Sequence, residues 1–169
     1  MTTSPSRYVT EDKEQALTDK IVKKINEIAG QFPEKESALL PALHVIQDAF
    51  GWVPYTAVRQ LADILEITPN KVYGVLTFYT MFNTKPVGKN HLQICRNLSC
   101  SLLGAKHIIE HVSKKLSIEP GETTENGEFS LSLVECLGAC GTAPVMMVND
   151  KYYENLTEEK VDKILESLQ

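Results

Sequence analysis

Four cysteines, arranged as two spaced pairs, limit the folds open to this chain more than any other feature of its sequence. Cys95 and Cys100 are separated by four residues, and Cys136 and Cys140 by three, with 35 residues between the pairs. Each pair follows a stretch that reads as a short strand. A loop after a strand can aim side chains outward from a fixed scaffold. The chemistry of the chain depends on whether the four thiols form one site.

The first half of the chain has the periodicity of helices. Apolar residues recur at helical spacing in four stretches: 21–29, 39–50, 58–65 and 72–79. Gly30 and Gly51 are stop signals for the first two. Pro54 suits the first turn of the third helix, and Thr68 with Pro69 forms an N-cap followed by a first-turn proline. Four short helices with short links predict a small bundle.

The pattern changes at 83–90, where Pro86 and Gly88 interrupt it. Strands and helices then alternate: strands at 91–95, 129–133 and 144–148, a turn at 149–150, and helices at 102–116 and after a Thr157 cap. We therefore predict an α+β (α/β) chain of two domains. Residues 1–86 form the helical bundle, with a disordered or extended tail over the first 12 or so. Residues 87–169 form a mixed domain small enough to gain stability from a metal centre.

Charge and hydropathy exclude some partners. The net charge is −5, divided as −1 over residues 1–88 and −4 over 89–169. Nucleic acids and anionic membrane surfaces are bound by basic patches, so neither is expected as a partner. No apolar stretch approaches a membrane span, and the first residues lack a signal core. We expect a soluble intracellular protein, in which cysteines serve more readily as metal or redox ligands than as disulfides.

The spacing of the cysteines leaves several chemistries open. Zinc ribbons use tighter C-x2-C pairs for one tetrahedral ion, and thioredoxin-type dithiols use C-x-x-C. Disulfides or unrelated free cysteines are further alternatives. An iron–sulfur cluster is favoured, because a C-x4-C pair also occurs in plant-type [2Fe–2S] ferredoxins.

The neighbours of the cysteines suit negative sulfur. Cys100 is placed at or next to the start of the 102–116 helix, where backbone N–H groups favour a thiolate. Small or polar residues could donate hydrogen bonds to sulfur, although ordinary turns favour the same residues: Asn97, Ser99, Ser101, Gly138, Ala139, Gly141 and Thr142. Arg96 could offset the charge of a cluster, but a solvated surface arginine is the simpler interpretation.

Other candidates are weaker. His107 and His111 lie one helical turn apart, and without a third ligand in evidence we interpret them as surface residues. His44 and His91 are isolated. The aromatic segment 78–82 could be a partner surface, although a helix core is favoured. Phosphate-binding glycine loops, Ser–His–Asp sets and paired carboxylates are not evident. We therefore expect no catalytic residue and no nucleotide site in this chain.

Three segments together resemble a known family: VYGVLTFYTMF at 72–82, CRNLSC at 95–100 and VECLGACGTAPVMMVND with the YYENLT that follows, within 134–157. The chain is similar, from about residue 18 onward, to the thioredoxin-like [2Fe–2S] subunit of NADH:quinone oxidoreductase, often called the E subunit of that complex.

The resemblance implies a helical bundle followed by a thioredoxin-like ferredoxin domain. It implies one [2Fe–2S] cluster held by Cys95, Cys100, Cys136 and Cys140, with one iron on each pair. It also implies a partner flavoprotein subunit that binds FMN and NADH and carries a [4Fe–4S] cluster, gripped in part by the N-terminal helices. The complex would lie on the cytoplasmic side of the membrane. Related subunits serve NAD(P)-linked bifurcating hydrogenases and formate dehydrogenases, and a zinc-stabilised interaction module is the non-redox alternative. The bond between Ala143 and Pro144 could be cis or trans.

Overall fold

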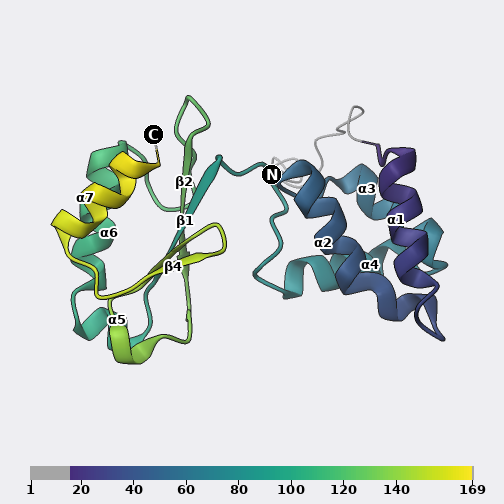
Figure 1. The fold of residues 1–169 in the computed structure, drawn as a ribbon, viewed down its shortest axis with the longest axis horizontal. Helices are drawn as coiled ribbons and strands as arrows, with labels where there is room; N and C mark the ends of the chain where they lie inside the picture. Colours follow the sequence, from purple (N-terminus) through teal and green to yellow (C-terminus); the bar gives the residue numbers. More distant parts are fainter. Residues whose placement is uncertain (1–15, 169) are drawn as a thin grey trace, which may run out of the picture. The chain divides into compact units, whose positions relative to one another are not determined.

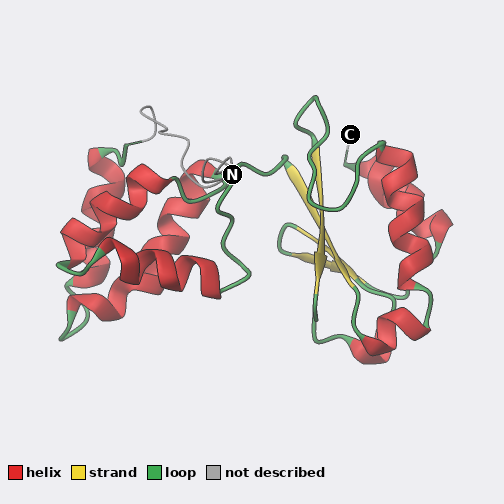
Figure 2. Cartoon of the chain, turned by 180° about the vertical axis from the view of Figure 1, so that it is seen from behind, coloured by secondary structure: helices red, strands yellow, loops and turns green. Residues whose placement is uncertain are grey.

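The computed structural model describes residues 16–168 and contains two compact units, the first ending at Pro86 and the second beginning at Val87. The polar tail predicted for the first 12 or so residues lies outside the described residues. The elements are α1 (Asp19–Ala29), η1 (Lys35–Ala38), α2 (Leu39–Phe50), α3 (Tyr55–Leu65), α4 (Pro69–Phe78), β1 (Asn90–Cys95), α5 (Leu98–Leu102), α6 (Ala105–Leu116), β2 (Phe129–Val134), η2 (Cys140–Thr142), β3 (Met146–Val148), β4 (Lys151–Tyr153) and α7 (Glu158–Ser167). Figures 1 and 2 show an α+β chain, as predicted.

The first unit consists of helices packed around one apolar core. The apolar stripes of α1 to α4 meet there, and their central side chains are fully buried: Ile25, Leu43, Ile46, Leu61 and Val72. Gly51 ends α2 in the left-handed conformation, at φ 78°, which glycine adopts without strain. Pro54 takes the N-cap position of α3 and not its first turn. Thr68 and Pro69 begin α4 as predicted, with the Thr68 hydroxyl accepting from the Lys71 N–H.

The second unit is built on a four-stranded sheet in the order β2-β1-β3-β4. β1 and β2 run parallel, whereas β3 is antiparallel to both β1 and β4. In Figures 1 and 2, α6 and α7 lie on the same side of this sheet. Alternate strand residues such as Leu92, Ile94 and Leu131 form a core with Val112 and Val161 of these helices. In β2, apolar Phe129 and Leu131 of this alternating strand belong to that core.

The helix predicted at 102–116 begins three residues later than expected, and a separate short helix precedes it. The stretch 102–116 was expected to be continuous, but α5 ends at Leu102 and α6 begins at Ala105. Between them Gly104 has φ 95°, a conformation that interrupts a right-handed helix and is open to glycine. Cys100 is consequently inside the short helix α5 and not at the start of the long one.

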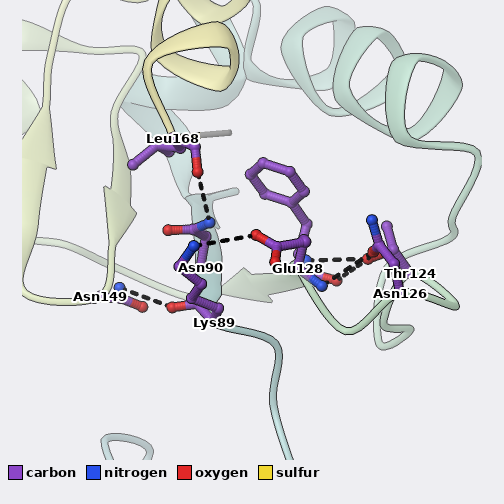
Figure 3. Close-up of polar contacts among 8 residues, drawn as sticks. Lys89, Asn90, Thr124, Asn126, Glu128, Asn149 and Leu168 are labelled. Atoms are coloured by element: carbon purple, nitrogen blue, oxygen red, sulfur yellow. Dashed lines mark hydrogen bonds and ion pairs between the residues drawn. The ribbon is translucent and has the colours of Figure 1, made fainter.

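A network of polar contacts fixes the starts of β1 and β2 (Figure 3). The Asn90 N–H donates to the Glu128 carbonyl at 2.8 Å, and the Asn90 side chain donates to the Leu168 carbonyl at 3.4 Å. The Asn149 amide donates to the Lys89 carbonyl at 3.1 Å. These contacts hold the register in which Asn90 pairs with Phe129 and Cys95 with Val134. The opposite ends of the two strands, where the cysteines lie, are thereby aligned.

None of the helices in residues 16–168 is long and apolar enough to cross a membrane.

Candidate metal centre

The parallel pairing of β1 and β2 brings the two cysteine segments to one edge of the sheet. Cys95 is the last residue of β1 and pairs with Val134, the last residue of β2. Cys136 follows β2 by two residues. The strands are locked at this edge by the Arg96 N–H, which donates to the Val134 carbonyl at 3.0 Å. Since the carboxyl ends of parallel strands meet at one edge, both loops start side by side.

The first pair of thiols is buried. Cys95 and Cys100 are 4% and 3% exposed and pack with Ala105, Ala143 and Val145 in a small core of their own. Burial raises the pKa of the Cys100 thiol, and a side-chain hydrogen bond with Cys95 raises it further, while a backbone hydrogen bond from Val145 lowers it. The two thiols therefore lie close to each other within this small core.

The second pair lies in a tight, exposed loop. Cys136 and Cys140 are both exposed, and Cys140 opens η2. The Gly138 N–H donates to the Cys136 sulfur at 3.3 Å, with Gly138 at φ 72°. The negative charge of a Cys140 thiolate reaches Cys100 and contributes to its raised pKa. The Glu135 carbonyl, one residue before Cys136, lies 3.9 Å from the Cys95 sulfur, so the two cysteine loops are adjacent.

The predicted hydrogen-bond donors to sulfur are present only in part. The Gly138 amide donates as expected. The Asn97 side chain instead accepts from the Leu98 N–H and caps α5, and the Thr142 hydroxyl bonds the Ala139 carbonyl and Glu154. The Val145 backbone contact to Cys100 was missed, because nothing in the sequence signals which distant loop folds over a given thiol.

The donor set of four thiols fits a [2Fe–2S] cluster. All four cysteines are free thiols. In the part of the chain that the structure describes, no three His, Cys, Asp or Glu side chains are placed as ligands of one metal ion. A [2Fe–2S] cluster needs only two thiolates on each iron, and the two loops offer thiols as two neighbouring pairs.

Arg96 is on the surface, as the simpler interpretation held, but it is paired. Its Nε donates to the Glu135 carboxylate at 3.0 Å and its Nη2 donates to the same oxygen. The hydrogen bond and charge of Glu135 raise the pKa of Arg96. Glu135 was not singled out from the sequence, although its place directly before Cys136 was a signal.

The histidines take no part in this site. His107 and His111, one turn apart on α6, face the carboxylates of α7: His107 bonds Glu158 at 2.7 Å and His111 bonds Asp162 at 2.8 Å. His44 packs against the Phe82 ring, with ring centroids 4.9 Å apart. The surface interpretation of the α6 pair holds for His107, which is 73% exposed at its side chain, whereas His111 is half-buried.

The core interpretation of the aromatic segment 78–82 was wrong for most of it. Phe78 is 75% exposed, and Tyr79 and Met81 are also exposed, whereas Phe82 is buried. Phe78 and Tyr79 contact each other edge to face, with centroids 5.0 Å apart. The first unit therefore has an aromatic surface at the end of α4.

The Ala143–Pro144 bond, left open by the sequence, is cis.

The fold and the cysteine pairs define a class of protein. A family model of thioredoxin-like [2Fe–2S] ferredoxins matches residues 25–169. The chain belongs to this family, and the cofactor of the family is a [2Fe–2S] cluster.

Individual relatives narrow the comparison. The E 2 subunit of NADH-quinone oxidoreductase from Rhizobium meliloti (strain 1021) is 45% identical over 143 residues, which cover 85% of each chain. The E subunit of NADH-quinone oxidoreductase from Rickettsia bellii (strain RML369-C) is 43% identical over 170 residues, 99% of this chain and 98% of the relative. A solved NAD+-reducing [NiFe]-hydrogenase in the air-oxidized state matches 78% of this chain with a TM-score of 0.68 and 22% identity. This chain covers 22% of that chain, and the match shows a shared fold.

Proposed function

We propose that this chain is the electron-transfer E subunit of an NADH-quinone oxidoreductase, and so a part of an oxidoreductase complex that catalyses nothing alone. The observation that carries the proposal is the pair of cysteine loops at one edge of β1 and β2, in a chain that is similar over nearly its full length to the E subunits of such complexes.

The proposed ligands are the four cysteines, Cys95 and Cys100 for one iron, and Cys136 and Cys140 for the other. When bound, the cluster supplies one-electron redox chemistry. The chain's own groups then have defined roles. Burial of the first pair keeps water from those sulfurs, and the Gly138 N–H and the Val145 backbone contact stabilise negative charge on sulfur.

The proposed partner is a flavoprotein subunit that binds FMN and NADH, carries its own [4Fe–4S] cluster and exchanges one electron with this chain. The absence of a phosphate-binding glycine loop from the sequence supports this division, because nicotinamide and flavin then need another chain. The exposed Phe78, Tyr79 and Met81 also support a protein partner, since aromatic residues and Met are enriched in interfaces. We place the assembly on the cytoplasmic face of the membrane, with this subunit peripheral.

A second candidate is the equivalent subunit of an NAD(P)-linked hydrogenase or formate dehydrogenase, favoured by the fold shared with the NAD+-reducing hydrogenase. Purification of the tagged chain from its own cells separates the two. Copurifying membrane subunits with NADH-dependent quinone reduction support the first candidate, whereas hydrogen or formate oxidation in the purified complex would replace it by the second. A colourless protein containing zinc would contradict both.

A further inference from the structure

An ion pair spans the roots of the two cysteine loops. Arg96 directly follows Cys95 at the end of β1, and Glu135 directly precedes Cys136 after β2. The Arg96 side chain donates through Nε and Nη2 to one oxygen of Glu135, and its main chain donates to the Val134 carbonyl. The Glu135 carbonyl is in turn 3.9 Å from the Cys95 sulfur. Each loop thus contributes one charged residue, and each of these residues is the immediate sequence neighbour of a cysteine.

We propose that Arg96 and Glu135 are positioning residues for the cluster, clamping the two cysteine loops at a fixed separation while keeping their local charge neutral. The proposal rests on the proposed function, because it takes the four cysteines as the ligands.

Global stability is not the role of this pair. The two side chains are 54% and 74% exposed, and exposed ion pairs contribute little to the free energy of unfolding. Their effect is local. Cys95 and Cys136 lie in separate segments of the chain, and at the sheet edge these segments are held together by the hydrogen bonds between β1 and β2 and by this ion pair. Glu135 is the single residue between β2 and Cys136, so loss of the pair frees the backbone that leads directly to that cysteine.

The charges have opposite consequences when removed singly. Without Arg96, the Glu135 carboxylate stands unpaired one residue from Cys136 in the chain and disfavours the added electron, so the midpoint potential falls. Without Glu135, the Arg96 guanidinium is unpaired and the potential rises. Without both, the local charge stays neutral and only the clamp is lost. The double neutral variant therefore separates geometry from electrostatics.

The unit offers a matched control at the other end of the same two strands. Lys89 precedes β1 and Glu128 precedes β2, and their side chains form an exposed ion pair at 3.4 Å. Figure 3 shows these two residues at the strand starts, whereas Cys95 lies at the opposite end of β1. Lys89→Gln with Glu128→Gln removes an equivalent cross-strand pair without touching the cysteine loops.

The experiment uses the full-length holoprotein. Variants are Arg96→Gln, Glu135→Gln, both together, the charge swap Arg96→Glu with Glu135→Arg, and the Lys89/Glu128 control. The first readout is the rate of loss of visible absorbance in the presence of a chelator. The second is the midpoint potential by redox titration, and the third is hydrogen exchange of the main-chain amide at position 96, relative to the intrinsic rate of the residue there.

We expect the double neutral variant to lose the cluster about threefold faster than wild type, with faster exchange of the main-chain amide at position 96 and an unchanged potential. The charge swap should restore the wild-type rate of cluster loss. The two single variants should shift the midpoint potential in opposite directions, and the Lys89/Glu128 control should match wild type in all three readouts. A double neutral variant that behaves like the control in cluster loss and in exchange would overturn the proposal. If wild-type protein holds no [2Fe–2S] cluster, the proposed function fails, and Arg96 exchange still tests the clamp by itself.

Discussion

Gly88 illustrates how a single residue fixes the second unit. Its N–H donates to the Ser130 hydroxyl at 2.6 Å, and the backbone at the start of β2 lies directly against it. A Cβ at this position would be 2.7 Å from the Phe129 carbonyl carbon and 3.0 Å from the Gly127 oxygen. These are backbone atoms of a strand end, so they cannot rotate away as a flexible side chain would.

We predict that Gly88→Ala destabilises the protein by about 1–3 kcal/mol, the usual range for overpacking a tight site. Gly74→Ala is the control, because Gly74 is inside α4 with nothing within 4 Å of its added Cβ. It should instead stabilise the helix by about 0.5–1 kcal/mol. Urea unfolding of both variants tests the prediction, and an equal effect of the two substitutions would contradict it.

His91, in β1, makes the stability of the second unit depend on pH. It is 9% exposed, with Nε2 at 2.8 Å from the Ser132 hydroxyl and Nδ1 at 3.3 Å from the Gln93 amide nitrogen. Because that amide nitrogen can only donate, Nδ1 accepts and the ring is neutral. Burial lowers the pKa of His91.

An unfolded histidine binds a proton near pH 6.5, whereas folded His91 binds one only at lower pH. Its contribution to stability is therefore complete above about pH 6.5 and is lost as the pH falls toward the folded pKa. His91→Gln should remove this part of the pH dependence. Urea unfolding of wild type and variant at pH 7.5 and pH 5 is the test. Equal losses of stability on acidification in both proteins would show that His91 is not responsible.

At the scale of the residue, only features with a local sequence pattern could be predicted for the candidate site. The cysteine spacing was visible, and so was the strand before each pair. The exposure of Phe78 was also available in principle, because Val72, Val75 and Leu76 define one face of α4 and Phe78 lies off that face. The Arg96–Glu135 pair was not accessible, since it depends on β1 and β2 being parallel neighbours in register.

At the scale of the element, helix ends were predicted better than helix interruptions. Gly51 and the Thr68–Pro69 pair act through local backbone chemistry, which a short sequence window contains. The separation of α5 from α6 depends on Gly104 taking φ 95°, and a single glycine inside a helical pattern indicates a break only weakly. The burial of Cys100 against Val145 forms only after β3 packs beside β1, so periodicity could not reveal it.

The cap of α7 gives a prediction at this scale. The Thr157 hydroxyl accepts from the Lys160 N–H at 3.2 Å, satisfying one of the free N–H groups of the first turn. Thr157→Ala should lower the free energy of unfolding by about 1 kcal/mol. Thr157→Ser keeps the capping hydroxyl, so its free energy of unfolding should stay close to that of wild type. Chemical denaturation of the three proteins measures both values. A Ser variant as unstable as the Ala variant would assign the loss to the methyl group and not to the cap.

At the scale of the whole molecule, each unit has an apolar core of its own. The core of the first lies among α1 to α4, and that of the second lies between the sheet and the helices α6 and α7. In the sequence, the periodicity changes near residue 87. A core within each unit is the condition for independent folding.

We therefore predict that a fragment of residues 87–169 folds cooperatively and takes up the cluster on reconstitution with iron and sulfide. Because the unit is small, the cluster should raise its thermal midpoint clearly above that of the apo fragment. Circular dichroism melting with and without reconstitution measures this. A fragment that stays unfolded even with the cluster components present would show that the second unit depends on the first.

The most direct test of the central claim is iron and sulfide analysis of the purified wild-type chain, with an EPR spectrum after reduction. The account predicts two irons and two sulfides per chain, a signal that appears on reduction with dithionite, and its loss or strong alteration in Cys95→Ser and Cys136→Ser. It also predicts a midpoint nearer the plant-type value of about −400 mV than the Rieske range. Zinc in place of iron, or spectra unchanged by both substitutions, would contradict the assignment of the four cysteines as the ligands of a [2Fe–2S] cluster.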